Sequence, residues 1–343
     1  MIKVRGINYN AGIEYNPLFP VANKIDLTKL RKDLILIKKL NCNAIRFYGS
    51  YIDKLILYSQ EALKKGFEVW ISPRLINGDK KQTIKFVGEA SKKAEELRKK
   101  YKKVIFIVGN ELIIDSAGIF PFSTIPEKME ALRVYLTLKN IKDKTNRIKE
   151  ISKSINNFLR RIDTKTKDFI EDIRKEATKN FKGKITYASF PSEEVDWEKF
   201  DIISINLYKN QWNESTYKEK LRQLKQYKKP IAITEFGTCA YIGASKKGGS
   251  AYDIIDYKTN TIKEGIIRDE NEQSEYLKDL IELYKKENIF ATFVFDFKEE
   301  WKIHRKNSKK DFDLGSFGIM KVLENGKIFP KKAFDTVKKN YSK

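Results

Sequence analysis

Hydrophobic positions along the chain follow two spacings, and stretches with each spacing alternate. Short apolar runs such as residues 67–72 are typical of strands buried on both faces of a parallel sheet, whereas apolar residues three or four apart are typical of amphipathic helices. The predicted strands cover residues 3–8, 43–48, 67–72, 104–111, 185–190, 201–208, 231–234 and 290–297. The predicted helices cover residues 27–40, a segment ending at 64–66, 81–101, 214–228, 270–287 and 331–341. This alternation predicts βα units and a parallel sheet.

Eight strand–helix units in 343 residues predict an α/β fold, the (β/α)8 TIM barrel. Residues 112–184 are too many for one helix and two loops, so we expect an enlarged insertion after the fourth strand with two or more helices. Long connections also follow the seventh strand, as a Gly-rich loop over 237–269, and the eighth. In a TIM barrel these connections form the active face. No linker rich in Pro, Gly or Ser divides the chain, which predicts one domain over residues 1–343.

Two of the predicted strands end in a glutamate. Residues 104–111 read VIFIVGNE and residues 231–237 read IAITEFG, so Glu111 and Glu235 each follow a buried apolar run. A carboxyl group in this position loses water, which raises its pKa and makes it a useful proton donor near neutral pH. If both strands end on one barrel rim, the two side chains converge as the pair that retaining glycoside hydrolysis requires, with carboxyl groups about 5–5.5 Å apart.

The surroundings of the two glutamates predict different roles. Glu111, which follows an apolar strand and an amide, is the better proton donor. Glu235 needs a neighbouring cation to stay ionised, and Arg46 at the end of the second strand is the candidate.

Other side chains near the predicted rim could contact a sugar. Asp296 could bind a hydroxyl group or form a salt bridge with a rim lysine. Aromatic side chains on the long loops could stack on sugar faces, although each could instead pack in the interior. These are Tyr48, Tyr208, Trp212, Tyr241 and Trp301. Trp70 lies within a strand and is expected in the core.

Composition narrows the possible functions. The net charge of +23 could indicate a nucleic-acid surface, but the lysines are spread along predicted helix faces such as residues 92–103, so solvated helices are expected instead. The chain has no apolar run of about 18 residues and no apolar signal core, which predicts a cytoplasmic protein without a membrane partner. Abundant Lys and Ile with two cysteines would suit a thermophile.

The few cysteine and histidine residues argue against a metal centre. Cys42 and Cys239 are expected to be free thiols. His304, the single histidine, lies in the loop expected after the last strand, where a structural role or a substrate contact is open.

Five short motifs give the chain a resemblance that covers nearly its whole length. They are GINYN at 6–10, NAIRFY at 43–48, GNE at 109–111, INLY at 205–208 and ITEFG at 233–237. In this order they resemble the clan A glycoside hydrolases. The resemblance implies that Glu111 is the acid/base and Glu235 the nucleophile, that Asn110 binds the sugar 2-hydroxyl, and that Arg46 and Tyr208 steady Glu235.

A closer resemblance is to barrel proteins often labelled abortive infection proteins. It is carried by NELIIDSAGI at 110–119, TEFGTCAYIGASKKGG at 234–249 and DFDLGSFGIMKV at 311–322. That label implies phage defence, whereas the residues are those of a glycosidase. The chain departs from many clan members at two places: Asn206 stands where they have histidine, and Phe295-Asp296-Phe297 where a tryptophan is common.

The sequence therefore predicts a retaining β-glycosidase that acts on a carbohydrate without a cofactor or metal. Two alternatives stay open: a barrel that binds carbohydrate or polyanion without cleaving it, and a transglycosidase with the same residues. A nucleic-acid partner is not expected, and the sequence does not indicate an oligomeric state. Besides Glu111 and Glu235, the residues predicted to bind substrate are Asn8, Arg46, Tyr48, Asn110, Asn206, Tyr208, Trp212, Asp296 and Trp301.

Overall fold

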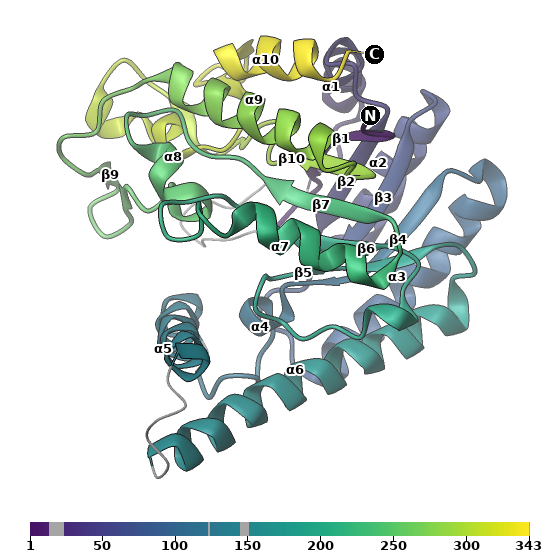
Figure 1. Ribbon diagram of the computed structural model, residues 1–343. Coiled ribbons are helices and arrows are strands. Elements are labelled where there is room, and N and C mark those ends of the chain that lie inside the picture. The colour runs from purple at the N-terminus through teal and green to yellow at the C-terminus, as the bar shows by residue number, and fades with distance from the viewer. Residues whose placement is uncertain (14–23, 123, 145–150, 343) are drawn as a thin grey trace.

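The computed structural model describes residues 1–13, 24–122, 124–144 and 151–342. Eight parallel strands form a closed barrel in which each strand pairs with its sequence neighbours and β1 pairs with β10 (Figure 1). The barrel strands are β1 (Val4–Asn10), β2 (Ala44–Gly49), β3 (Glu68–Pro73), β4 (Val104–Asn110), β5 (Ile185–Ser189), β6 (Ile203–Asn206), β7 (Ile231–Phe236) and β10 (Ala291–Val294). The predicted TIM-barrel fold is confirmed.

Helices surround the barrel because their apolar faces pack on its outer surface. They are α1 (Leu27–Lys39), α2 (Ile52–Lys64), α3 (Lys80–Tyr101), α7 (Tyr217–Leu224), α9 (Glu270–Lys286) and α10 (Lys332–Asn340). Local capping sets several of their first residues: Asp26 accepts a hydrogen bond from the Lys29 amide, and Asp79 forms a capping box with Gln82. A separate apolar cluster, which includes Trp70, Ile107 and Phe293, fills the barrel interior. The predicted core position of Trp70 is confirmed.

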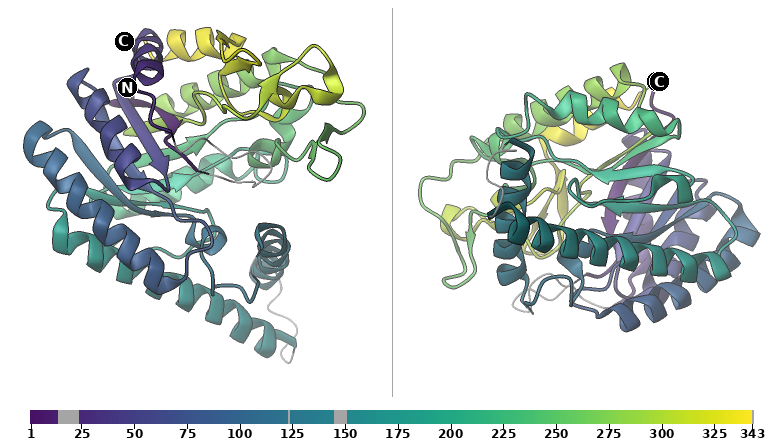
Figure 2. Two further views of the ribbon diagram at one scale, coloured as in Figure 1. Left: turned by 180° about the vertical axis from the view of Figure 1, so that it is seen from behind. Right: turned by 60° about the horizontal axis from the view of Figure 1, so that its bottom comes forward.

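In its described residues the insertion after β4 contains three helices, in line with the prediction of two or more. They are α4 (Leu112–Asp115), α5 (Ile125–Lys144) and α6 (Ile151–Asn180). α6 runs along the outside of the barrel and packs on α3, while α5 stands on the side toward which the arrow of β7 points (Figures 1 and 2). The insertion therefore reaches the end of the barrel where the strands finish.

The connections after β7 and β10 contain more regular structure than the sequence predicted. Residues 237–269, expected as a loop, include α8 (Ala244–Lys247) and the paired strands β8 (Ile255–Asp256) and β9 (Thr261–Ile262). After β10 a small sheet forms from β11 (Ile303–His304), β12 (Met320–Leu323) and β13 (Ile328–Pro330). His304 thus lies in a strand and not in a loop. Strands of two to four residues are too short to show a periodic apolar pattern.

The predicted helix over 214–228 is shorter in the structure. The side chain of Asn210 accepts hydrogen bonds from the amides of Trp212 and Asn213, which stabilises a turn and delays the start of α7. The helix then ends in a 3-10 turn, Lys225–Tyr227.

The structure bears on two predictions made from composition, the free thiols and the lack of a membrane-spanning segment. Cys42 and Cys239 are buried free thiols, as predicted. Among the helices in the described ranges, none combines the length and apolar character needed to cross a membrane.

Candidate active site

The two strand-end glutamates lie at the same end of the barrel. Glu111 directly follows β4, and its amide donates a hydrogen bond to the Ala188 carbonyl of β5. Glu235 lies in β7, paired in register with Asn206 of β6. Both side chains are largely buried, with 12% of the Glu111 side chain and 6% of the Glu235 side chain exposed. The barrel therefore brings together two carboxyl groups that are far apart in the sequence.

Arg46 connects the ends of several strands beneath these carboxyl groups. Its Nη1 donates to Glu235 Oε1 at 2.7 Å and to Asn8 Oδ1 at 3.0 Å, and its Nη2 donates to Asn110 Oδ1 at 2.7 Å and to Ser72 Oγ at 3.1 Å. Arg46 is fully buried. A buried guanidinium requires a nearby carboxylate, and Glu235 is the acidic side chain that Arg46 contacts.

The second oxygen of Glu235 also has a donor. The Tyr208 hydroxyl donates to Glu235 Oε2 at 2.9 Å, so each carboxylate oxygen accepts a hydrogen bond. Asn206, two residues before Tyr208, donates to Asn110 Oδ1 at 3.1 Å and links this group to the end of β4. These donors hold the Glu235 carboxylate in one orientation.

Glu111 has a different environment. Burial raises its pKa to about 8; the negative charge of Glu235 adds to the rise, while the Arg74 guanidinium lowers it. Arg74 Nη2 lies 3.9 Å from Glu111 Oε2, beyond hydrogen-bonding distance, and the Asn206 side chain also lowers the pKa of Glu111. Glu111 is therefore mostly protonated at neutral pH.

The site thus combines a protonated carboxylic acid with a carboxylate held by two donors. The charge of Glu235 is the second-largest cause of the raised pKa of Glu111, which indicates that the two groups interact electrostatically across the site. A proton donor opposite an anionic nucleophile or base can cleave a bond whose leaving oxygen needs a proton.

Three residues predicted to bind substrate are buried beneath the site. Asn8 donates to the Thr234 carbonyl at 2.9 Å and accepts from Arg46. The Tyr48 hydroxyl donates to Asp296 Oδ2 at 2.6 Å, and Asp296 Oδ1 accepts from the Phe297 amide. Burial raises the pKa of Asp296 well above its usual value. In this structure all three have protein partners, and none is more than 1% exposed.

The remaining aromatic candidates differ in exposure. Trp212 is 84% exposed in the turn after β6. Trp301 is half-buried, and Lys302 Nζ lies 4.9 Å from its ring centre. Tyr241 is only 1% exposed and donates to the Ala251 carbonyl, so it has the packing role left open for it.

Several residues close to the site were not predicted from the sequence. Arg74, directly after β3, forms two hydrogen bonds with Asp115 at 2.5 and 2.9 Å beside Glu111. A charged residue directly after a buried strand is a signal that could have identified Arg74. Tyr187 and Glu193 contact the backbone just after Glu111. Burial raises the pKa of Tyr252, which lies in the connection after β7, and Glu111 is one of the groups near enough to add to this rise. No local pattern marks these three residues.

His304 belongs to an ionic cluster in which an arginine supplies the positive charge. Within the described part of the chain, His304, Asp311 and Asp313 form a group whose ligand atoms lie within 4.8 Å of one another. Arg268 Nη2 lies 3.2 Å from His304 Nδ1 and donates to Asp311 at 2.7 Å and to Asp313 at 2.9 Å. The Arg268 guanidinium thus binds the side chains that could otherwise hold a metal ion. The cluster joins β11 to the connection after β7.

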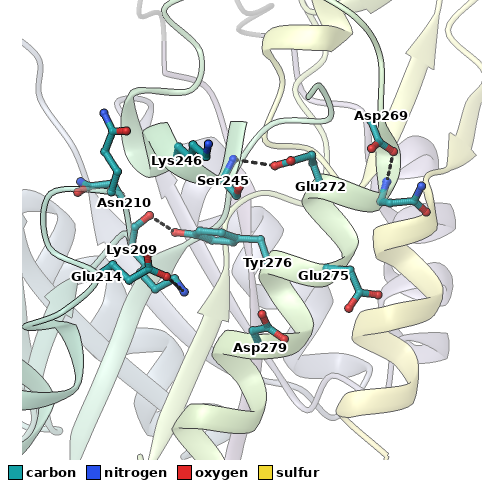
Figure 3. A pocket seen from close by; sticks show the side chains of 12 residues that line it. Lys209, Asn210, Glu214, Ser245, Lys246, Asp269, Glu272, Glu275, Tyr276 and Asp279 are labelled. Carbon is teal, nitrogen blue, oxygen red and sulfur yellow. Dashed lines mark hydrogen bonds and ion pairs between the residues drawn. The ribbon is translucent and has the colours of Figure 1, made fainter. Parts of the chain in front are cut away.

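A pocket of about 340 Å³ lies beside the barrel end, between the turn after β6, α8 and α9 (Figure 3). Its lining includes Lys209, Asn210, Glu214, Lys246, Glu272, Glu275 and Tyr276. The Tyr276 hydroxyl donates to the Lys209 carbonyl at 2.8 Å, and Glu272 accepts from the Ser245 amide. Neither Glu111 nor Glu235 lines this pocket, so it is separate from the candidate active site.

Solved structures with a similar fold exist, whereas the sequence comparisons find no match. No protein-family model matches the sequence, and no curated protein matches it. Among solved structures, the chain is similar to a GH2 β-galacturonidase from Eisenbergiella tayi bound to galacturonate, with 17% identity and a TM-score of 0.54 over 99% of this chain and 51% of that one. It is also similar to a β-glucuronidase from Ruminococcus gnavus, in complex with an N1-substituted uronic isofagomine, with 13% identity and a TM-score of 0.59 over 99% and 49%. The chain spans about half the length of these glycosidases.

Proposed function

We propose that this protein is a retaining glycosidase that cleaves a β-glycosidic bond, with Glu235 as nucleophile and Glu111 as acid/base. The observation that carries the proposal is the contrast between the two carboxyl groups. Arg46 and Tyr208 donate to both oxygens of Glu235, whereas burial keeps Glu111 protonated at neutral pH. A retaining mechanism needs this pair of protonation states before the first step.

In the first step, an oxygen of Glu235 forms a bond to the anomeric carbon as the bond from that carbon to the leaving oxygen breaks. The proton of Glu111 moves to the leaving oxygen. The resulting ester has no charge at Glu235, so the contribution of that charge to the raised pKa of Glu111 disappears. Glu111 then accepts a proton from water as the water oxygen attacks the anomeric carbon and releases the Glu235 carboxylate.

Two further observations support a carbohydrate substrate. The order of the strand-end motifs resembles clan A, and the similar solved structures are glycosidases named for glucuronides and galacturonides. At 13–17% identity these likenesses support the reaction class and leave the sugar open. The substrate panel should therefore include aryl β-glycosides of glucose, galactose, glucuronic acid and galacturonic acid.

Covalent trapping tests the proposal most directly. Cyclophellitol-type aziridines in the four configurations of the panel should label the protein, and peptide mapping should find the adduct on Glu235 within residues 231–237. Glu235→Gln should abolish labelling, while Glu275→Gln, an exposed carboxylate of the separate pocket, should leave it unchanged. An adduct on another carboxylate, or cleavage of the panel without any adduct, would contradict the assignment of Glu235.

The net charge of +23 favours a second candidate, a barrel that binds a polyanionic carbohydrate without cleaving it. This function predicts binding to heparin that weakens steeply with salt, together with no turnover of the panel. Turnover of any aryl glycoside that depends on Glu235 would exclude it. If the acceptor is a second sugar and not water, the same residues would give a transglycosidase, which analysis of the products separates from hydrolysis.

A further inference from the structure

The backbone at Glu111 has a conformation that is unfavourable for residues other than glycine. Its φ of 38° and ψ of 51° lie in the left-handed region. There the Cβ atom comes too close to the following carbonyl oxygen. The residue lies between the end of β4 and the four-residue helix α4. Contacts from elsewhere in the protein must therefore hold this conformation.

Those contacts come from β5 and the turn that follows it. On the preceding side, the Glu111 amide donates to the Ala188 carbonyl at 3.0 Å. On the following side, the Leu112 amide donates to the Tyr187 hydroxyl at 2.8 Å, and the Ile113 amide donates to Glu193 Oε1 at 2.9 Å. The peptide groups on both sides of Glu111 are thus tied to one neighbouring segment.

Glu193 links these contacts into a single unit. Besides the Ile113 amide, its Oε1 accepts from the Tyr187 hydroxyl at 2.8 Å, and its Oε2 accepts from the Phe190 amide at 2.7 Å. One carboxylate therefore joins the end of β5 to the start of α4 through three hydrogen bonds. Tyr187 is fully buried.

We propose that Glu193 is a positioning residue for the acid/base: it fixes the left-handed turn at Glu111 and so directs that side chain toward the leaving oxygen. The inference rests on the proposed function. Glu193 acts on Glu111 indirectly, through the Leu112 and Ile113 amides and Tyr187. A shift of about 1 Å in a proton donor is enough to slow its step by up to about 100-fold.

The test uses two glycosides of whichever sugar in the panel the wild-type protein cleaves fastest. A 2,4-dinitrophenyl leaving group departs without a proton, whereas a phenyl group needs one. Glu193→Gln should lower kcat/KM for the phenyl glycoside roughly 10-fold and for the dinitrophenyl glycoside by less than about 2-fold. A general loss of folded protein would reduce both equally.

Three variants complete the comparison. Glu111→Gln should show the same selectivity with a larger loss, about 10²- to 10⁴-fold on the phenyl glycoside. Tyr187→Phe removes the hydroxyl that joins the Leu112 amide to Glu193, and should repeat the selective loss even if Glu193→Gln folds poorly. Glu194→Gln, at the adjacent residue with 58% of its side chain exposed, should change neither rate.

The outcomes separate the positioning role from the proposed function. Selective loss in Glu193→Gln or Tyr187→Phe together with selective loss in Glu111→Gln supports the positioning role. Selective loss in Glu111→Gln with equal losses on both substrates in the other two variants overturns it and leaves the acid/base assignment intact. A Glu111→Gln variant without selectivity, or a wild-type protein that cleaves none of the panel, overturns both.

Discussion

The ends of β4 and β7 carry the same side chain in opposite electrostatic surroundings. At the end of β7, Glu235 accepts hydrogen bonds from Arg46 and Tyr208 at 2.7 and 2.9 Å. At the end of β4, the Arg74 guanidinium lies 3.9 Å from Glu111 and is hydrogen-bonded to Asp115. Burial without a paired cation raises the pKa of Glu111 to about 8.

The difference comes from the neighbours and not from the two strands themselves. Arg46 comes from β2, which does not neighbour β7 in the barrel, and Tyr208 follows the neighbouring strand β6, so the two donors to Glu235 come from different parts of the barrel. Glu111 instead has its backbone held by β5 and the turn after it. Burial raises the pKa of a carboxyl group and a neighbouring cation lowers it, whatever strand the group follows.

The largest effect should come from removing the anion. Glu235→Ala should lower kcat at least about 10⁴-fold, because it removes the proposed nucleophile. Added azide should restore turnover and give the α-glycosyl azide, detected by NMR. Glu111→Ala with azide should give the β-glycosyl azide instead. The reverse pairing of products would exchange the two roles.

Arg46→Lys tests whether the guanidinium geometry matters as well as its charge. An ammonium cannot reach Glu235, Asn110 and Asn8 in the planar arrangement that Arg46 uses, so kcat/KM should fall roughly 10²-fold. Melting temperature serves as the control for folding. Activity close to wild type in a stable Arg46→Lys protein would show that charge alone is sufficient.

Glu111→Gln should stabilise the fold while it weakens catalysis. The pKa of Glu111 is raised from 4.5 to about 8, so between these values the folded state binds more protons than the unfolded state and stability falls as pH rises. The amide does not titrate, so the free energy of unfolding at pH 8 should increase by about 4 kcal/mol relative to wild type, with little change at pH 4. Urea denaturation at the two pH values measures this. A larger gain at pH 4 would contradict the raised pKa.

The pH dependence of turnover gives the smallest and most graded effect. kcat/KM for a phenyl glycoside should fall about tenfold per pH unit above pH about 8, because the acid form of Glu111 is lost. The dinitrophenyl glycoside, which needs no proton, should not show this limb. If kcat/KM fell equally for both substrates above this pH, the fall would come from the ionisation of a group other than Glu111.

Much of the fold was predictable because its pattern is local. The runs at 67–72 and 104–111 and the helical spacing over 27–40 appear in the structure as β3, β4 and α1 within a few residues. The short strands β8, β9 and β11 were missed because two residues cannot show an alternation. His304 was placed in a loop for the same reason.

The candidate site was predictable in part. Glu111 and Glu235 stand out because each follows an apolar run, and Arg46 because it is a charge within one. Tyr187 and Glu193 do not stand out, since their role depends on which amides they meet across the β4–β5 junction. Tyr48 and Asp296 look suited to a sugar in the sequence, but in the structure they bond to each other.

The sequence by itself determined the order of strands and helices, and hence the barrel and the carboxyl group at the end of two of its strands. That follows because hydrophobic spacing and turn residues act over neighbouring positions. Only the tertiary structure decided which groups surround each carboxyl group, and with them the raised pKa of Glu111. Arg46 meets Glu235 across 189 positions of the chain, and a pKa responds to the charges and water around a group and not to its neighbours in sequence.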